Sequence, residues 1–310
     1  MQPKYIRPIA ILAFAASTAF GADPKLLNLA MPDTKILAGV NVTTAKVSPL
    51  GQFVIAQMQS GIAQMQAAFA ALGFNPFTDA TELLMASAGD PAKPGGLLMM
   101  DGVFKVDQIA AALNGQTQIY AGATLVVLPA KDKTTPAVAF IGSTMAVAGD
   151  VTAVKAALDR AGTPTTIDPA LIARANALSA DDDVWIASSA PVASLMGAGG
   201  GAAAPMLQML SSIQSFSGAV KLGGNVQAAV QAVASSDKNA QALGDVARLI
   251  VSMGTMGAAK DSEAAGLIQV LQSLQISTSG SNVNLALNLP EAQVEGLLKA
   301  LMPASKSNGN

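Results

Sequence analysis

The sequence predicts an α+β fold, with antiparallel sheets backed by long helices and two similar halves. Several short segments alternate apolar and polar residues with a period of two, which is typical of strands with one buried face. Gly-Ser and Gly-Gly-Asn turns join some of these segments into hairpins. Two longer stretches carry apolar residues at steps of three and four, the spacing of an amphipathic helix.

The first 21 residues have the pattern of a secretory signal peptide. Lys4 and Arg7 form a basic start, residues 8–16 are apolar, and Ala19-Phe20-Gly21 fits a small-x-small cleavage site. The apolar run is too short to span a bilayer, and no cysteine follows it to carry a lipid anchor. We therefore expect removal of residues 1–21 and a periplasmic or extracellular location in a bacterium. No transmembrane segment is expected in the mature chain.

The first half is predicted to span residues 22–162. Its first strand places Ile36, Ala38, Val40 and Val42 on one face and runs to Thr43. A break at Ser48-Pro49-Leu50-Gly51 then leads into a long helix that ends near Leu72. The remaining elements expected in this half are an apolar segment at 83–88, a strand at 95–104, a helix at 106–113, a strand at 124–128, a hairpin at 137–148 and a helix capped by Asp150.

The second half is predicted to span residues 163–302, after the boundary at Gly162-Thr163-Pro164. A striped helix through Leu243 and Met253 precedes the clearest hairpin, at 274–289. The other elements expected here are a helix at 168–178, a strand at 184–188, a helix around 206–210, strands at 216–222 and 226–233, and a closing helix from 290 to 301. The similar plan of the two halves suggests an internal duplication, and residues 303–310 read as a disordered tail.

Composition removes several classes of function. The chain contains no cysteine and no histidine, so disulfides, Cys or His zinc sites, Ser-His-Asp triads and Cys-His pairs are excluded. Loss of Lys4 and Arg7 changes the net charge from −2 to −4, and no basic cluster is present, which argues against a nucleic-acid partner. Charged residues make up 12% of the chain, 51% is hydrophobic, and the mean hydropathy is +0.43, so small apolar side chains must form much of the core.

Two motifs resemble catalytic or cofactor signatures without their required context. Ser235 and Lys238 have the Ser-x-x-Lys spacing of penicillin-binding enzymes, but the Lys-Thr-Gly partner motif is missing and the segment suits a helix N-cap. The glycine-rich loop 197–201 loosely matches a dinucleotide-binding turn, but Pro191 has already ended the preceding strand and no acid follows at the needed distance. We therefore predict no catalytic residues, no cofactor site and no cofactor.

Asp181, Asp182 and Asp183 form the most concentrated acidic cluster, next to the single tryptophan, Trp185. Paired carboxylates can bind calcium or cleave glycosides, and tryptophan stacks on sugars. The calcium-loop pattern is not met, and adjacent acids at the start of a strand are usually solvated, whereas Trp185 alternates into the core. We therefore predict no metal site.

Methionines at helical spacing offer the main candidate for a binding surface. Methionine adapts to varied apolar partners, although methionine stripes are more often core filler. The candidate apolar groove consists of Met58, Met65, Met206 and Met209; Met253 and Met256 belong to the same class of positions.

The opening at Ile36–Gly51 and the closing hairpin and helix at Leu274–Leu301 resemble a loose group of exported bacterial proteins of unknown function. The resemblance implies no activity and transfers no functional residue. The leading hypothesis is an exported, non-catalytic protein that binds a protein partner or an apolar small molecule. Its first alternative is a periplasmic carrier of an acyl chain, which a pocket between helix and sheet would favour. The others are a hydrolase that uses carboxylates or Ser and Lys, and a structural envelope protein with a large exposed apolar patch.

Overall fold

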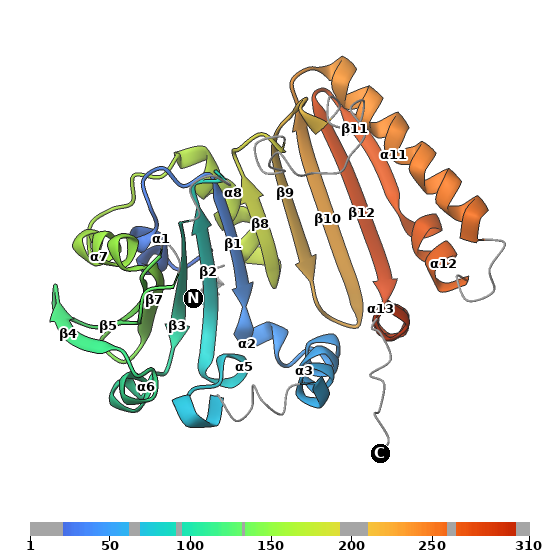
Figure 1. The fold of residues 1–310 in the computed structure, drawn as a ribbon. Coiled ribbons are helices and arrows are strands. Elements are labelled where there is room, and N and C mark those ends of the chain that lie inside the picture. Colours follow the sequence, from blue (N-terminus) through green and yellow to red (C-terminus); the bar gives the residue numbers. More distant parts are fainter. Residues whose placement is uncertain are drawn as a thin grey trace, which may run out of the picture.

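The computed structural model describes residues 21–61, 69–90, 95–131, 134–192, 210–258 and 265–301. These residues form one antiparallel sheet of 12 strands with helices on both faces, which confirms the predicted α+β class (Figure 1). The strand order is β11-β12-β10-β9-β8-β1-β2-β3-β7-β6-β5-β4, so both edges of the sheet come from short hairpin strands.

The strands are β1 (Ile36–Asn41), β2 (Ala80–Ser87), β3 (Gly96–Gly102), β4 (Gln116–Tyr120), β5 (Ala123–Val127), β6 (Pro136–Ile141), β7 (Met145–Asp150), β8 (Val184–Ser188), β9 (Ile213–Lys221), β10 (Asn225–Ala234), β11 (Gln275–Ser279) and β12 (Asn282–Pro290). The helices are α1 (Pro24–Leu29), α2 (Val42–Ala45), α3 (Pro49–Gly61), α5 (Pro76–Asp79), α6 (Val106–Ala112), α7 (Val151–Arg160), α8 (Pro169–Asp181), α11 (Asp237–Ala258), α12 (Ala265–Ser273) and α13 (Glu291–Leu301).

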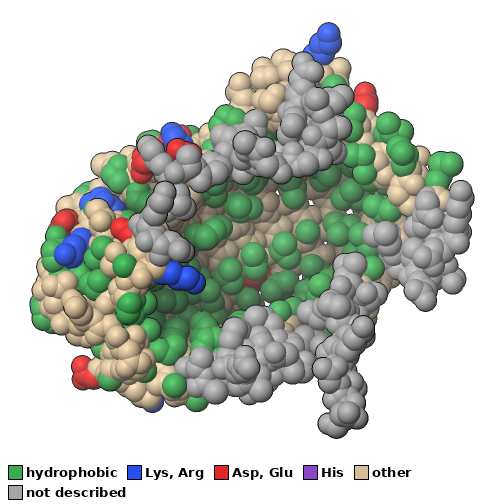
Figure 2. Space-filling model, in the orientation of Figure 1, with side chains coloured by type: hydrophobic (Ala, Val, Ile, Leu, Met, Phe, Trp, Pro, Cys, Tyr) green, Lys and Arg blue, Asp and Glu red, His purple; other side chains and the backbone are tan. Residues whose placement is uncertain are grey.

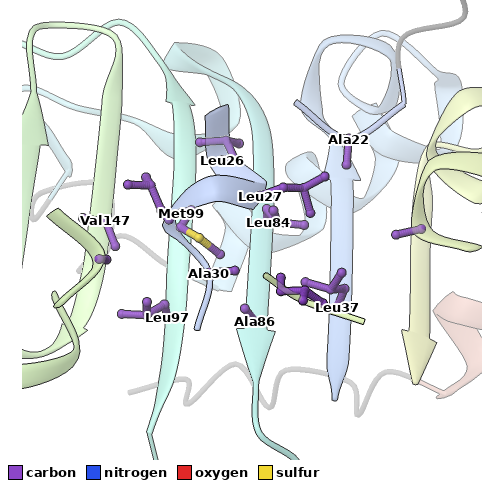
Figure 3. Close-up of a cluster of buried hydrophobic side chains, with 14 of the residues drawn as sticks. Ala22, Leu26, Leu27, Ala30, Leu37, Leu84, Ala86, Leu97, Met99 and Val147 are labelled. Atoms are coloured by element: carbon purple, nitrogen blue, oxygen red, sulfur yellow. The ribbon is translucent and has the colours of Figure 1, made fainter. Parts of the chain in front are cut away.

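One face of the sheet, which we call the core face, packs against α1, α7 and α8. Leu37 of β1, Ala86 of β2 and Leu97 of β3 form one row across this face, Leu84 and Met99 form the next, and all five are fully buried. Leu26 and Leu27 of α1 pack onto these strands from above (Figure 3). This cluster is the largest group of buried apolar residues, and it fixes the centre of the sheet.

On the opposite face, which we call the concave face, the described helices α6 and α11 cover the two ends, and α2, α3 and α5 lie over part of the central strands β8, β1 and β2. Near one end α6 contributes Ile109 to a cluster with Phe104 and Phe140, and at the other end Ala240 of α11 packs on Val283. Between these covers the face carries apolar residues whose exposed fractions reach 47% at Met85 and 41% at Leu98. Figure 2 shows this face as a hollow lined by hydrophobic side chains.

The two predicted halves share the sheet, because β1 and β8 pair antiparallel in its middle. The first half supplies β1 to β7, and the second half supplies β8 to β12. The sequence predicted antiparallel sheets in two similar halves, and the structure joins the strands of both halves in one continuous sheet. Internal duplication stays a prediction.

Most predicted elements are present within a few residues of their expected bounds. Asp150 caps α7 by accepting a hydrogen bond from the Thr152 N–H, and Gly162 follows the helix with φ +82°. The hairpin at 274–289 is β11 and β12, joined at Gly280. The first strand was predicted to reach Thr43, which was wrong, because Asn41 ends the strand and caps the short helix α2. The strand β4 and the helices α2, α5 and α12 were not expected.

Within the described residues, no helix combines the length and apolar character needed to cross a membrane.

Candidate functional site

An apolar cavity of about 390 Å³ lies between the concave face and the helices α2, α3 and α5. Its floor is a row of paired residues, Leu83 of β2, Val40 of β1 and Val184 of β8. The residues that line it are Val40, Val42, Ala45, Lys46, Leu50, Gly51, Val54, Ile55, Pro76, Phe77, Leu83, Val184 and Leu222. Every lining side chain except that of Lys46 is apolar, so the cavity suits an apolar ligand.

The roof of the cavity is set by close contact between α2 and α3. Gly51 allows this contact, because a Cβ on this residue would lie 1.9 Å from the carbonyl oxygen of Ala45. The Ser48 hydroxyl donates to the Ala45 oxygen at 2.7 Å and accepts a hydrogen bond from the Gly51 N–H at 3.0 Å. The Ser-Pro-Leu-Gly break seen in the sequence is therefore the joint that places α3 over the sheet.

The C-terminal helix secures the start of α3. The carboxylate of Glu291, at the first position of α13, accepts a hydrogen bond from the backbone N–H of Leu50. Both residues are buried, and α13 packs against α3. A carboxylate at the positive end of a helix also interacts favourably with its dipole, so the far end of the chain holds the helix that covers the cavity.

Lys46 is the one charged residue of the lining. Its Nζ donates a hydrogen bond to the carbonyl oxygen of Thr78 at 3.1 Å, which ties the end of α2 to α5. The side chain is partly buried. A lysine with a long apolar stem and a charged tip is suited to the border between an apolar cavity and water.

The methionines predicted to form the apolar groove are not placed by the structure. The side chains of Met58, Met65, Met206 and Met209 lie outside the described residues. Met253 and Met256 of α11 are described and are 63% and 70% exposed, so they are not core filler. The cavity instead uses valine, leucine, isoleucine and phenylalanine, which the sequence analysis did not single out.

Of the two segments that resemble catalytic or cofactor motifs, the structure describes the one that contains Ser235 and Lys238. Ser236 accepts a hydrogen bond from the Asn239 N–H at the start of α11, which confirms the predicted N-cap role of this segment. Lys238 is exposed next to it. The loop 197–201 lies outside the described residues.

The acidic cluster at 181–183 departs from the prediction of solvated acids. Asp183 is buried, accepting hydrogen bonds from the Thr44 hydroxyl and, at 2.6 Å, from the Leu222 N–H. Burial also raises the pKa of Asp182. Trp185 is 4% exposed on the core face, as predicted. Asp183 therefore links α2 to the end of β9 next to the cavity, and the described residues contain no group of acids arranged to hold a metal.

A second cavity, of about 280 Å³, is polar and lies beside Trp185 on the core-face side. Glu82 and Asp101 are among its lining residues, which include no lysine. Burial raises the pKa of Glu82 to about 7, and the nearby charges of Asp23 and Asp101 act in the same direction. Asp101 accepts a hydrogen bond from the Thr81 hydroxyl at 2.9 Å.

Comparison with known proteins shows a likeness in fold alone. No family model matches the chain, and no curated protein matches it. Two solved structures, crystal forms III and IV of TP0453, align with TM-scores of 0.52 and 0.51 at 9% and 8% sequence identity. The alignment covers 90% of this chain and 99% of TP0453 in form III, and 88% and 95% in form IV. This chain is similar in fold to TP0453. The alignment includes nearly the whole of both chains, so the likeness concerns the complete sheet and its helices.

Proposed function

We propose that this protein binds the acyl chain of a lipid-like molecule in the apolar cavity under α3 and carries it as an exported protein. The observation that supports this function is the cavity itself: an unfilled space of about 390 Å³ between helix and sheet, lined by apolar side chains. Ligand cavities in proteins are typically about 300–1,000 Å³, so the space is large enough to receive part of an acyl chain.

The surroundings of the cavity extend the apolar path. Met85 and Leu98 pair across β2 and β3 on the same face as Leu83 and are 47% and 41% exposed. Burying such surface against an acyl chain is favourable by about 25 cal/mol per Å² of apolar area. The concave face thus supports entry or extension of a chain that is longer than the cavity.

The position of Lys46 favours an anionic amphiphile over a neutral one as the ligand. Its ammonium lies at the boundary of a lining that is otherwise apolar, where it would attract a carboxylate or phosphate head group. The acyl chain then lies against Val40, Leu83 and Val184, and the head group stays near the helix end. Export of the carrier follows from the predicted signal peptide and not from the cavity.

Filling the cavity is expected to abolish this binding. Leu83→Trp places a large ring on the cavity floor, so the affinity for palmitate should fall at least about tenfold, equivalent to about 1.4 kcal/mol. The matched control is Ile119→Trp, on the edge strand β4, where the side chain is 73% exposed and outside the cavity lining. Titration of each purified variant with palmitate, followed by calorimetry, measures the difference. If Leu83→Trp unfolds the protein, Val184→Trp on the exposed end of the floor takes its place.

Equal palmitate affinity in the cavity variant and its control would overturn the proposed site. So would the absence of binding in the unmodified protein.

Removing the charge at Lys46 is expected to affect head-group selectivity rather than chain binding. Lys46→Gln should weaken palmitate binding about two- to fivefold, because a partly solvated ion pair contributes only about 0.2–1 kcal/mol. Binding of hexadecanol, which has the same chain and no charge, should not change. Competition between the two ligands for each variant measures the effect, and an equal loss for both ligands would show that Lys46 acts only by holding α5.

A further inference from the structure

The polar cavity lies where the chain enters the fold. Gly21 and Glu82 are both part of its lining, and Ser179 of α8 borders it. Ala22, the next residue, is 3% exposed and belongs to the main core. The backbone at the predicted cleavage site is therefore already docked against the sheet.

The backbone N–H groups of Ala22 and Asp23 both donate hydrogen bonds to polar side chains that line this cavity. The Ala22 N–H donates a hydrogen bond to Ser179 Oγ at 2.7 Å. The Asp23 N–H donates to Glu82 Oε1 and Oε2 at 3.2 and 3.4 Å. Because successive residues are about 3.8 Å apart and the Asp23 nitrogen is 3.2 Å from Glu82 Oε1, the Ala22 nitrogen lies within about 7 Å of the Glu82 carboxylate, close enough for a free amine to reach it by a local adjustment of the chain end.

Glu82 is a partly buried acid without a cationic partner in the described part of the chain. The ion pair found among these residues joins Arg248 and Asp245, far along the chain. The groups that face Glu82 are the carboxylates of Asp23 and Asp101, which add negative charge, and the Asp23 N–H, which favours the ionised form. A single positive charge at this position would remove the cost of ionising Glu82.

We infer that cleavage after Gly21 supplies this charge: the new α-ammonium of Ala22 stays in the cavity and pairs with Glu82. Hydrolysis of the Gly21–Ala22 peptide bond consumes one water, leaves a carboxylate on Gly21 and frees the amine of Ala22, which is protonated at neutral pH. The ammonium has three N–H donors where the peptide had one. One donor keeps the bond to Ser179, and the others face the space that Gly21 leaves.

This inference depends on the predicted leader and is independent of the acyl ligand. It assigns Glu82 the role of recognising the processed N-terminus of a segment that is already packed on the core face. A precursor that keeps residue 21 has an uncharged amide at this position and leaves Glu82 unpaired.

The first test is the N-terminus of the full chain after export from a bacterial host. Sequencing of the purified protein should give Ala22 as its first residue, and a different first residue would overturn the inference. The second test compares three N-termini of the same protein: free Ala22, acetylated Ala22, and Gly21 retained as one extra residue. NMR titration of the Glu82 side chain should give a midpoint at least about one pH unit lower for free Ala22 than for the acetylated form.

Thermal unfolding against pH gives an independent readout. In the acetylated form the pKa of Glu82 is raised on folding, so stability should fall as the pH rises from about 4.5 toward 7. With free Ala22 this fall should be much smaller, and stability should instead drop as the pH passes the raised pKa of the amine, above its usual value of about 8. In the Glu82→Gln variant, the three N-terminal forms should show the same dependence of stability on pH. Identical pH profiles for free and acetylated Ala22 in the protein with Glu82 would contradict the pairing.

Discussion

Replacing Leu84 with alanine is expected to destabilise the protein by about 2–5 kcal/mol, the range for buried leucine-to-alanine changes. Leu84 is fully buried on the core face of β2, between Gly39 of β1 and Met99 of β3. Its removal leaves a cavity under α1 that flanking strands, held by hydrogen bonds on both sides, cannot close. Urea unfolding followed by circular dichroism measures the loss as a lower midpoint.

Met85→Ala is the matched control for this change. Met85 is the next residue on the same strand, but it faces the concave side and is 47% exposed. Its replacement should cost less than about 1 kcal/mol, close to the small effects of surface substitutions. Similar losses for the two variants would show that the core lies elsewhere than assigned.

Replacing Gly39 with valine is the second large effect. A Cβ at Gly39 would lie 2.5 Å from ring atoms Cε2 and Cζ2 of Trp185, its partner across β1 and β8. The tryptophan is packed against the core and cannot move away freely, so we expect a loss of about 1–3 kcal/mol or more from overpacking. Because Trp185 is the single tryptophan, its fluorescence emission should also shift as the ring is displaced.

Ala38→Val provides the control for the change at Gly39. Ala38 is adjacent on β1 and faces the concave side, where it is partly exposed. Stability and tryptophan emission should both stay close to those of the unmodified protein. In addition, Trp185→Leu should recover part of the stability lost in Gly39→Val, because the smaller side chain makes room for the new Cβ. No recovery in the double variant would contradict a direct clash.

The fold could be predicted where apolar periodicity and turn residues agreed. The alternation of Val283, Leu285, Leu287 and Leu289 identified β12, and the glycine at position 280 identified its turn. β4 was missed because an exposed edge strand buries neither face. Gln116, Thr117 and Gln118 are all exposed, and thus no apolar alternation marks them. Pairing with β5 makes this segment a strand, and pairing is not visible in a local pattern.

The candidate site could not be predicted, because a cavity differs from a core only in what its side chains leave empty. Val40, Leu83 and Val184 read as ordinary strand residues, and their meeting depends on the pairing of β1 with both β2 and β8. The burial of Asp183 has the same origin. Its hydrogen-bond partners Thr44 and Leu222 are 139 and 39 residues away in the chain, and they satisfy a carboxylate that would otherwise be solvated.

The most direct test of acyl-chain binding is native mass spectrometry of the mature protein purified from the periplasm of an expressing bacterium. The account predicts a bound mass of several hundred daltons that organic extraction releases as a lipid with an anionic head group. This mass should be lost in Leu83→Trp and kept in Ile119→Trp. A protein without bound mass, which also fails to take up palmitate when offered it, would contradict the account and favour a protein partner instead.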